Sequence, residues 1–318
     1  MLVTGGHGVI GSWVCRELDR RGATPIVLDV AARPAVTFPD ASPPQSVQGD
    51  LGDSSVLSAL ISRHGVTRIL HLAAIVGAPA ERDPELAIEV NALATARLLE
   101  VAAASGLARV VAMSTKGVLG PLAARFLHPS YEPVPTDLPP SPESIYETTK
   151  LVVERLVVRA REAGRSAAAV RLATTWGPGK SGVSHAGYSL HSDIVAAAVE
   201  GRSSHVDVHP DQGYDLVYYA DVAAGLVAAT TTPGALRSPV YHVGSGHVVT
   251  MRAFAGAVET AFPGVRVTLG ERFPAGRNCR LDLEAASSDF GYRPAWDVAS
   301  ALQDVRRRNE APAGRRPS

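Results

Sequence analysis

Apolar residues along the first 173 positions fall into short continuous runs that alternate with longer segments of helical spacing. The runs predict strands at 2–4, 25–29, 68–72, 109–113 and 166–172, and the longer segments predict helices at 10–21, 56–64, 85–105 and 144–163. Strands that alternate with helices favour parallel βαβ units, and strands without polar alternation are typical of a sheet covered on both faces. With right-handed crossovers, the pattern predicts an α/β protein with a doubly wound parallel sheet.

The rhythm breaks after Ala173. Residues 174–187 are rich in Gly, Ser and Thr, as are the loops that bind ligands beyond the carboxyl ends of parallel strands. The apolar pattern then resumes with a predicted strand at 216–219 and a predicted helix at 221–230. The break indicates that the first domain ends near this loop.

We therefore expect two regions in the chain. The first is a domain at 1–173, to which the segment 215–232 returns. The second is a smaller α/β region at 174–318 that binds the substrate, with a frayed tail from about residue 306, where charged residues give way to Pro, Gly and Arg.

Composition and charge narrow the function classes. The chain has 318 residues, 46% of them hydrophobic, and its 31 basic and 31 acidic side chains cancel. A neutral chain lacks the electrostatic footprint of a protein that binds nucleic acid or anionic membranes, and no apolar run approaches the roughly 18–20 residues of a membrane span. Cys15 and Cys279 stand in no CxxC pair and no zinc-like cluster. We expect a cytoplasmic protein that holds no metal and binds neither nucleic acid nor membrane.

Gly5, Gly8 and Gly11 form a glycine loop between the first predicted strand and the first predicted helix. Such a loop lets backbone N–H groups approach a pyrophosphate at the helix N-terminus, where the helix dipole favours negative charge. Asp29 ends the second strand, near the offset expected for an acid that accepts hydrogen bonds from ribose hydroxyls. A carboxylate there repels a 2′-phosphate, whereas the nearby Arg33 would attract one. The loop and the acid together predict a dinucleotide site with a preference for NAD over NADP.

A second motif places a phenol and an ammonium on one helix face. Tyr146 and Lys150 are four residues apart, and residues i and i+4 share a face. A free tyrosine has a pKa near ~10 and is a poor base at neutral pH. A nearby lysine cation and the positive nicotinamide ring favour the phenolate and lower that pKa. Tyr146 can then remove a hydroxyl proton while a hydride leaves the same carbon.

Over almost its whole length the chain resembles the extended short-chain dehydrogenase/reductases, the NAD-dependent epimerase/dehydratase family. Further segments match that family in order: Asp50-Leu51, His71-Leu72-Ala73-Ala74, Asn91, Ser114 to Gly120, Gly177-Pro178-Gly179, Asp215 to Asp221 and Gly291 to Pro294. A single match of this kind means little, but the ordered series is specific. The resemblance implies a Rossmann fold and an NAD cofactor.

The resemblance also implies roles for individual residues. Thr115 would donate a hydrogen bond to the substrate oxygen, Lys150 would bind the nicotinamide ribose, and Asn91 is the family's helix asparagine. Tyr146, Lys150, Thr115 and Asn91 would thus form the catalytic set. The implied NAD-binding residues are Gly5, Gly8, Val9, Ile10, Gly11, Asp29, Asp50, Leu51, Leu72, Ala73, Ala74, Tyr146 and Lys150.

Departures from the family's pattern narrow the substrate. Thr115 is followed by Lys116-Gly117, where nucleotide-sugar 4,6-dehydratases carry two acidic residues, and this argues against water elimination. Tyr214 stands where the family has an arginine that contacts a substrate diphosphate, and tyrosine cannot supply that charged bidentate contact. These differences favour a small polar substrate without a nucleotide diphosphate, unless Arg202 or Arg277 binds phosphate instead. The candidate substrate contacts are Thr115, Thr174, Tyr188 and Tyr214.

Three functions remain under consideration. The first is an NAD-dependent dehydrogenase that oxidises a secondary alcohol of a sugar, sugar acid, or hydroxy or amino acid, with Tyr146 as base. The alternative is a nucleotide-sugar 4-epimerase, in which the same residues return the hydride to the opposite face of the ketone. A non-enzymatic dinucleotide sensor is disfavoured because the Tyr/Lys pair is present. By analogy with the family we expect a homodimer through helices 85–105 and 144–163.

Overall fold

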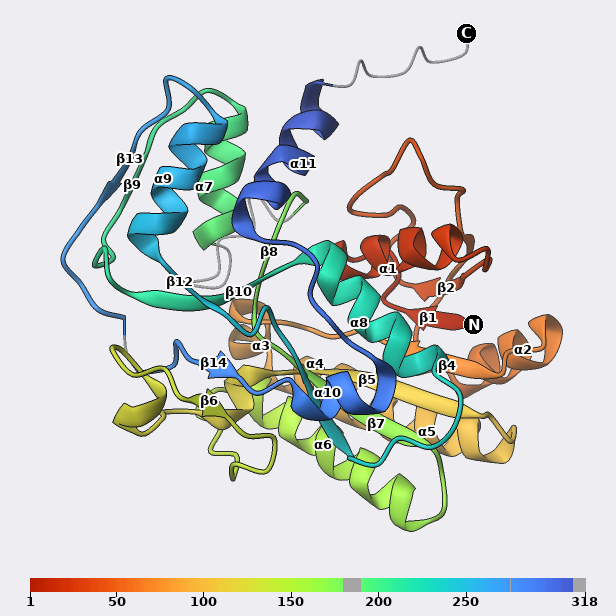
Figure 1. Ribbon diagram of the computed structural model, residues 1–318. Coiled ribbons are helices and arrows are strands. Elements are labelled where there is room, and N and C mark those ends of the chain that lie inside the picture. Colours follow the sequence, from red (N-terminus) through yellow and green to blue (C-terminus); the bar gives the residue numbers. More distant parts are fainter. Residues whose placement is uncertain (180–189, 275, 311–318) are drawn as a thin grey trace, which may run out of the picture.

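A seven-stranded parallel sheet forms the centre of the computed structural model, which describes residues 1–179, 190–274 and 276–310. The strand order is β11-β7-β5-β4-β1-β2-β3 (Figure 1). The strands are β1 (Leu2–Thr4), β2 (Ile26–Asp29), β3 (Gln45–Gln48), β4 (Arg68–His71), β5 (Arg109–Thr115), β7 (Ala167–Leu172) and β11 (Val240–Val243). The predicted doubly wound parallel sheet is confirmed.

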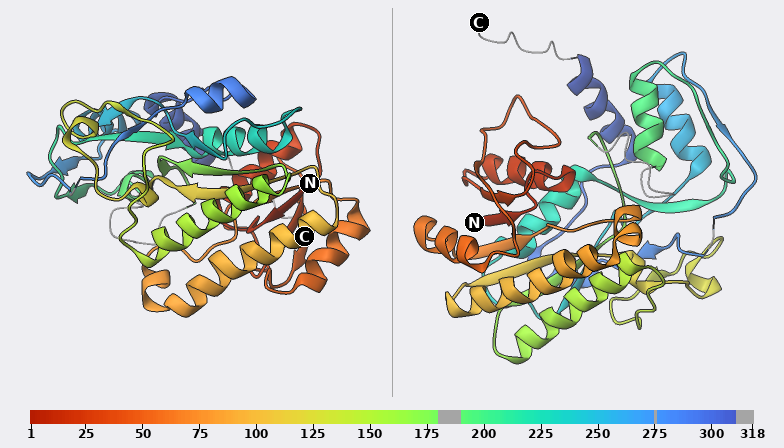
Figure 2. Two further views of the ribbon diagram at one scale, coloured as in Figure 1. Left: turned by 90° about the horizontal axis from the view of Figure 1, so that it is seen from below. Right: turned by 180° about the vertical axis from the view of Figure 1, so that it is seen from behind.

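Helices cover both faces of this sheet (Figures 1 and 2). One face carries α2 (Ser54–His64), α5 (Ala94–Ala104) and α6 (Ile145–Glu162), and the other carries α1 (Val9–Arg20), α8 (Tyr219–Thr231) and α10 (Glu284–Phe290). Because both faces are covered, the inner strands are apolar on both sides, and Val3, Leu70 and Val111 are fully buried. Residues at the carboxyl ends of the strands are consequently the ones positioned to meet a ligand.

The segment predicted as one helix at 85–105 consists of three stretches. It begins with α4 (Pro84–Ile88), which follows the short α3 (Ala78–Arg82), continues as the π-helical turn η1 (Glu89–Leu93) and ends as α5. A π turn inserts one residue into a helix and often marks a functional site. The apolar spacing predicted the helical extent, but it cannot register one extra residue inside a turn. The π turn contains Asn91, one of the predicted catalytic residues.

The start of α6 is fixed by a capping box. The Ser144 side chain accepts a hydrogen bond from the backbone N–H of Glu147 at 3.2 Å, and the Glu147 carboxylate accepts one from the backbone N–H of Ser144 at 3.1 Å. These reciprocal bonds satisfy two of the N–H groups left open at a helix start. Tyr146 is therefore held in the first turn of α6, directly after a defined cap.

The rest of the chain builds smaller sheets and helices beside the main sheet (Figure 2). Strand β10 (Gly213–Tyr218) lies between β8 (Thr174–Trp176) and β12 (Val248–Thr250). Two strand pairs join β9 (Ser204–Val206) to β13 (Val267–Leu269) and β6 (Pro133–Val134) to β14 (Arg280–Leu281). The helices here are α7 (Leu190–Val199), α9 (Met251–Ala261) and α11 (Val298–Glu310), and two 3₁₀ turns, η2 (Lys116–Leu119) and η3 (Ala124–Phe126), follow β5.

Two expectations about this region were wrong. The strand within 215–232 does not return to the main sheet, because β10 pairs with β8 and β12, and β11 takes the edge position beside β7. Helix α8, in contrast, packs against α1 of the first domain. The tail does not fray at 306, since α11 continues to Glu310. Arg308 ties α11 down because its guanidinium lies 4.9 Å from the Trp13 ring.

Within the described residues, no helix is long and apolar enough to cross a membrane. The same residues contain no group of three or more His, Cys, Asp or Glu side chains placed to hold a metal ion.

Candidate active site

The glycine loop packs tightly between β1, α1 and the segment after β4. Gly5 adopts a positive φ of 68°, and a Cβ there would lie 2.6 Å from the backbone nitrogen of Ala73. A Cβ on Gly11 would lie 2.3 Å from the carbonyl oxygen of Gly5. Side chains at these positions would push the loop away from its neighbours. The structure thus brings the glycines and the 72–74 segment, both predicted to bind the cofactor, into direct contact.

The amino-terminal end of α1 is suited to an anion. Its N-cap is Gly8, which makes no side-chain capping hydrogen bond, so the first N–H groups of the helix are not occupied by a side-chain cap. A pyrophosphate is a suitable partner for such N–H groups because the helix dipole adds to their attraction. The loop therefore fits the dinucleotide that the sequence predicts.

Two carboxylates end neighbouring strands beside this loop. Asp29, at the end of β2, accepts hydrogen bonds from the backbone N–H groups of His7 at 2.9 Å and Ala31 at 2.8 Å. Asp50 follows β3, which pairs with β2, and accepts from the N–H of Gly52 at 2.7 Å. Leu51, next to Asp50, is buried. A carboxylate has about four acceptor sites, so Asp29 can still accept from ribose hydroxyls.

Tyr146 and Lys150 lie one turn apart on α6, and both are buried. The Nζ of Lys150 donates a hydrogen bond to the carbonyl oxygen of Met113 at 3.0 Å and lies 5.9 Å from the centre of the Tyr146 ring. Burial lowers the pKa of Lys150 to about 8. At neutral pH this lysine is charged, and it lies close enough to the phenol to favour a phenolate.

Thr115 ends β5, two residues after Met113. Its Oγ1 accepts a hydrogen bond from the backbone N–H of Gly117 at 3.1 Å, where the chain turns into η2. That bond uses the hydroxyl oxygen as an acceptor, and the O–H can still donate. Thr115 is half-buried, so the hydroxyl has the chemistry and the exposure to hold a substrate oxygen.

Asn91 is fully buried in the π turn, and its side chain binds protein groups. Its Nδ2 donates to the carbonyl oxygen of Ile75 at 2.9 Å and to Thr149 Oγ1 at 3.0 Å, and its Oδ1 accepts from the N–H of Ile75 at 2.8 Å. These bonds tie the segment after β4 to α6. Asn91 therefore makes the contacts of a positioning residue, and its place in the catalytic set stays a prediction.

A buried ion pair beneath the site was not predicted. Arg171 of β7 and Glu154 of α6 make two parallel hydrogen bonds of 2.8 Å with side chains that are 3% and 4% exposed. Ser114 donates to the same Glu154 carboxylate at 2.7 Å, directly before Thr115. The pair joins the carboxyl ends of β5 and β7 to α6. An arginine inside the apolar run 166–172 was the signal that could have revealed it.

The predicted substrate contacts are less closely grouped. Tyr214 lies in β10 and is 5% exposed, with its ring 4.6 Å from His191 in an edge-on contact. Burial raises the pKa of Tyr214 to about 12, so its phenol is neutral at physiological pH. Thr174 begins β8 and is half-buried, and Tyr188 lies outside the described residues.

The two arginines considered for phosphate binding are engaged with carboxylates. Arg277 pairs with Glu143 and Glu147, and its carbonyl oxygen accepts a hydrogen bond from Lys116 Nζ at 3.0 Å. Arg202 pairs with Glu200 on the surface. Arg277 also lines a cavity of about 220 Å³, whose other lining residues include Leu127, His128, Gln212, Phe273 and Asn278. Arg277, which lines this cavity, pairs with Glu147, the residue after Tyr146 on α6.

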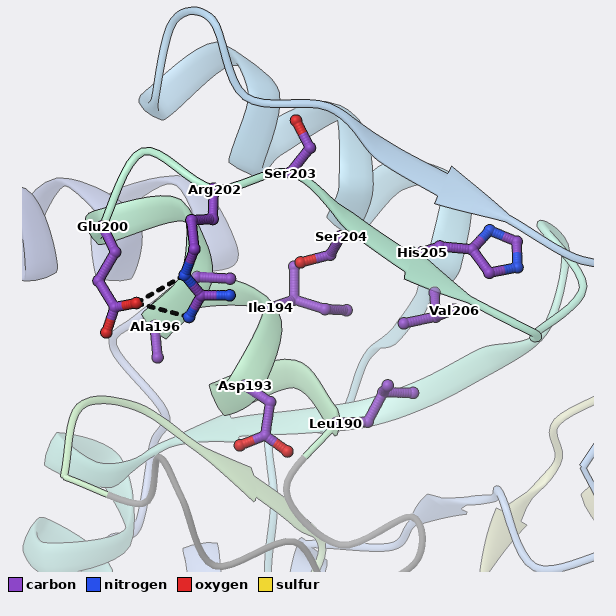
Figure 3. A pocket seen from close by; sticks show the side chains of 11 residues that line it. Leu190, Asp193, Ile194, Ala196, Glu200, Arg202, Ser203, Ser204, His205 and Val206 are labelled. Carbon is purple, nitrogen blue, oxygen red and sulfur yellow. Dashed lines mark hydrogen bonds and ion pairs between the residues drawn. The ribbon is translucent and has the colours of Figure 1, made fainter.

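A larger cavity of about 640 Å³ lies between α7 and β9 (Figure 3). Ile194 of α7 and Ser204 of β9 line it, and the ion pair of Glu200 with Arg202 lies at its edge. None of its lining residues belongs to the predicted catalytic or cofactor set. The size of a cavity does not by itself identify an active site.

Known proteins resemble this chain over nearly its whole length. A dTDP-6-deoxy-L-talose 4-dehydrogenase (NAD(P)(+)) from Kitasatospora kifunensis is 29% identical and covers 96% of this chain and 94% of its own. A 2-alkyl-3-oxoalkanoate reductase from Stenotrophomonas maltophilia is 26% identical, and the alignment covers 96% of this chain and 98% of the reductase. The solved structure of MoeE5 in complex with UDP-glucuronic acid and NAD is 26% identical, with a TM-score of 0.78. That alignment covers 96% of this chain and 98% of the MoeE5 chain.

The sequence model of the NAD dependent epimerase/dehydratase family matches residues 1–244. This match agrees with the parallel sheet, the glycine loop and the Tyr/Lys pair, and it confirms the family and the cofactor predicted from the sequence. The chain belongs to the NAD-dependent epimerase/dehydratase family and is an NAD-dependent enzyme of the short-chain dehydrogenase/reductase type.

Proposed function

We propose that this enzyme is a dehydrogenase that transfers a hydride between NAD and the secondary alcohol of a small polar substrate, with Tyr146 as the base. The observation that carries the proposal is the placement of Tyr146 and Lys150 one turn apart and buried, with the ammonium anchored on β5 just before Thr115. A phenol, an ammonium and a hydroxyl are the groups that this proton transfer needs.

The proposed cofactor site uses the loop and the strand ends already described. Gly5, Gly8, Val9, Ile10 and Gly11 would hold the pyrophosphate, and Asp29 the adenosine ribose. Asp50 and Leu51 would contact the adenine, and Leu72, Ala73 and Ala74 would line the cofactor's path. Tyr146 and Lys150 would meet the nicotinamide ribose. When bound, NAD supplies the hydride acceptor.

The protein's own residues would handle the proton. Thr115 donates a hydrogen bond to the substrate oxygen and holds it against the phenol of Tyr146. Tyr146 accepts the hydroxyl proton at its Oη as the carbon becomes a carbonyl. Lys150 stabilises the phenolate form of Tyr146 because its positive charge lies 5.9 Å from the centre of the ring.

The substrate in this proposal carries no nucleotide diphosphate. Tyr214 is neutral and packed, and Arg277 is already paired with two carboxylates. The cavity beside Arg277, about 220 Å³, suits a molecule smaller than the usual drug-sized ligand, whose pockets span roughly 300–1,000 Å³. The similar 2-alkyl-3-oxoalkanoate reductase is likewise named for a substrate that contains no nucleotide.

A nucleotide-sugar 4-epimerase is the second candidate function. It is favoured by similar proteins named dTDP-L-rhamnose 4-epimerase and UDP-glucuronate 4-epimerase 6, and by the nucleotide sugar bound to MoeE5. Epimerisation would use the same Tyr146 and Lys150, but NAD would be regenerated in every cycle. This candidate needs a cation for the diphosphate, and Arg277 could serve only after releasing Glu143 or Glu147.

One experiment separates the two functions. In one assay the enzyme is incubated with NAD and a panel of sugars, sugar acids, hydroxy acids and amino acids, and NADH formation is followed by absorbance. In a parallel assay it is incubated with UDP- and dTDP-hexoses, and the sugar products are analysed. If the enzyme is a dehydrogenase, we expect NADH to form from an alcohol without a nucleotide, and we expect Tyr146→Phe to form none. Epimerised nucleotide sugar without net NADH would replace the first proposal by the second.

We also propose that the enzyme is a homodimer and acts in the cytoplasm. Four exposed apolar side chains on α4, η1 and α6 support the dimer: Leu86, Ile88, Leu93 and Val152 are 41%, 47%, 50% and 39% exposed. Burying them against a second copy would form a contact of helices from both chains. Cys15 and Cys279 are unpaired thiols, as expected in a reducing compartment. Light scattering of Leu93→Lys against wild type tests the dimer.

A further inference from the structure

A chain of buried side-chain hydrogen bonds starts at the end of β1, directly before the glycine loop. Thr4 Oγ1 lies 2.7 Å from His71 Nδ1, and His71 Nε2 lies 2.8 Å from Thr95 Oγ1. Thr95 Oγ1 then donates to the carbonyl oxygen of Asn91 at 2.7 Å. All four residues are at most 2% exposed. Water is therefore excluded from every link between β1 and the π turn.

The direction of donation along this series of hydrogen bonds follows from its last bond, from Thr95 to Asn91. Because the Thr95 hydroxyl donates to Asn91, it accepts from His71, so Nε2 of His71 carries the hydrogen. The other ring nitrogen then accepts from the Thr4 hydroxyl. Burial, with a contribution from the charge of Lys150, lowers the pKa of His71 to about 3, and the ring is neutral at physiological pH. Each polar group along the way has a defined partner.

The π turn passes the connection to two walls of the proposed NAD site. The Asn91 side chain holds the backbone of Ile75 through two hydrogen bonds and reaches Thr149, which donates to the carbonyl oxygen of Tyr146 at 2.7 Å. Residues 72–76 form neither helix nor strand, so these bonds take the place of a sheet ladder. Figure 2 shows α5, which follows the π turn, lying beside α6.

We propose that His71 and Thr95 are positioning residues that fix the π turn relative to the glycine loop, and thereby hold the 72–75 segment and the first turn of α6 in the arrangement that NAD needs. Neither side chain touches the cofactor in this proposal. They act by preventing the loss of affinity that follows when a ligand must order its own site. The inference rests on the proposed assignment of the cofactor residues.

Thr95→Val tests this role because valine has the shape of threonine without the hydroxyl. The substitution leaves the N–H of His71 without its buried partner, and this group must then shift or stay unsatisfied. We expect the NAD dissociation constant, measured by calorimetry, to rise about tenfold. Thr95→Ser keeps the hydroxyl and should restore binding to within about twofold of wild type.

The control is Thr230→Val in α8. Thr230 is fully buried and donates to the carbonyl oxygen of Leu226 at 2.7 Å, the same i to i−4 bond that Thr95 makes. This variant should lose stability yet bind NAD as wild type does. If Thr95→Val does not fold, Thr149→Val breaks the connection at Tyr146 and should weaken NAD binding in the same way, with Thr149→Ser as its rescue.

The outcomes separate this inference from the proposed function. Equal NAD affinity in wild type, Thr95→Val and Thr230→Val would overturn the positioning role and leave the assignment of Tyr146 untouched. A serine variant that binds NAD as poorly as the valine variant would also overturn it, because the hydroxyl would then not be responsible. Failure of the wild-type protein to bind NAD would contradict the proposed cofactor site itself.

Discussion

Lys150 Nζ lies 5.9 Å from the centre of the Tyr146 ring and 3.0 Å from the carbonyl oxygen of Met113. The ammonium thus joins α6 to strand β5 two residues before Thr115. The contact has an energetic cost, because a charge that is 1% exposed has lost most of its hydration. That cost appears as the lowered pKa of Lys150, and it makes the stability of the protein depend on pH.

Replacing Lys150 by methionine should reveal this dependence. Between pH 8 and the ordinary lysine value of 10.5, the unfolded chain holds a proton that the folded chain has released, so this lysine makes the free energy of unfolding rise with pH. Below pH 8 both states are protonated and the cost of burying the charge is fully present. Denaturant unfolding at pH 7 and 9.5 should show wild type gaining on Lys150→Met at the higher pH. A constant difference would contradict the assigned pKa.

The buried His242 of β11 should make the stability of the protein depend on pH in the acid range. Burial, aided by the charge of Arg171, lowers the pKa of His242 to about 3, against 6.5 for a free histidine. Between these values only the unfolded chain binds the proton, and stability is lost as the pH falls. His242→Asn should flatten the fall in unfolding free energy between pH 6.5 and 4.5 by up to about 1.4 kcal/mol per unit. Equal slopes in wild type and His242→Asn would contradict the prediction.

Gly11→Ala should damage the loop. Its Cβ would lie 2.3 Å from the carbonyl oxygen of Gly5, so loop and helix must separate. We expect the NAD dissociation constant to rise about a hundredfold, measured by calorimetry. Gly256→Ala in α9 is the control, because a Cβ there meets nothing within 4 Å, and alanine should add roughly 0.5–1 kcal/mol of helix stability. Wild-type affinity in Gly11→Ala would show that the loop does not hold the pyrophosphate.

Much of the fold was accessible from local patterns in the chain. The inner strands are buried on both faces and therefore appear as apolar runs, and the capping residues Ser144 and Glu147 mark the start of α6. Strand β3 was missed because it is an edge strand of sequence Gln-Ser-Val-Gln, where neither face must be apolar. The pairing of β10 with β8 also escaped prediction, because an apolar run does not say which sheet it joins.

The buried pair of Glu154 and Arg171 gives a prediction for stability. Glu154→Gln leaves the arginine without a counter-charge, and breaking a buried pair costs about 3–5 kcal/mol. Glu200→Gln removes the partner of Arg202 on the surface, where both side chains are more than half exposed, and should have no measurable effect. Chemical denaturation of the two variants checks this. Similar small losses in both would mean that the buried pair adds little.

In the candidate site, as in the fold, the sequence predicts features within one segment but not contacts between distant segments. The glycine loop and the Tyr/Lys pair are spacings within one segment, so the sequence predicts them directly. The contact of His71 with Thr95 joins residues 24 positions apart, and that of Arg277 with Glu147 joins residues 130 apart. Such contacts arise only when the chain folds, and no periodicity encodes them. The same holds for Tyr214, whose packing against His191 depends on how α7 meets β10.

We propose that Tyr146 and Lys150 flank the nicotinamide, and a crystal structure with NAD and a bound alcohol or ketone would test this arrangement. We expect the phenol oxygen of Tyr146 about 2.7 Å from the substrate oxygen and the substrate carbon about 3.5 Å from the nicotinamide ring. A phenol turned away from the ring, with the substrate oxygen held by other side chains, would contradict it.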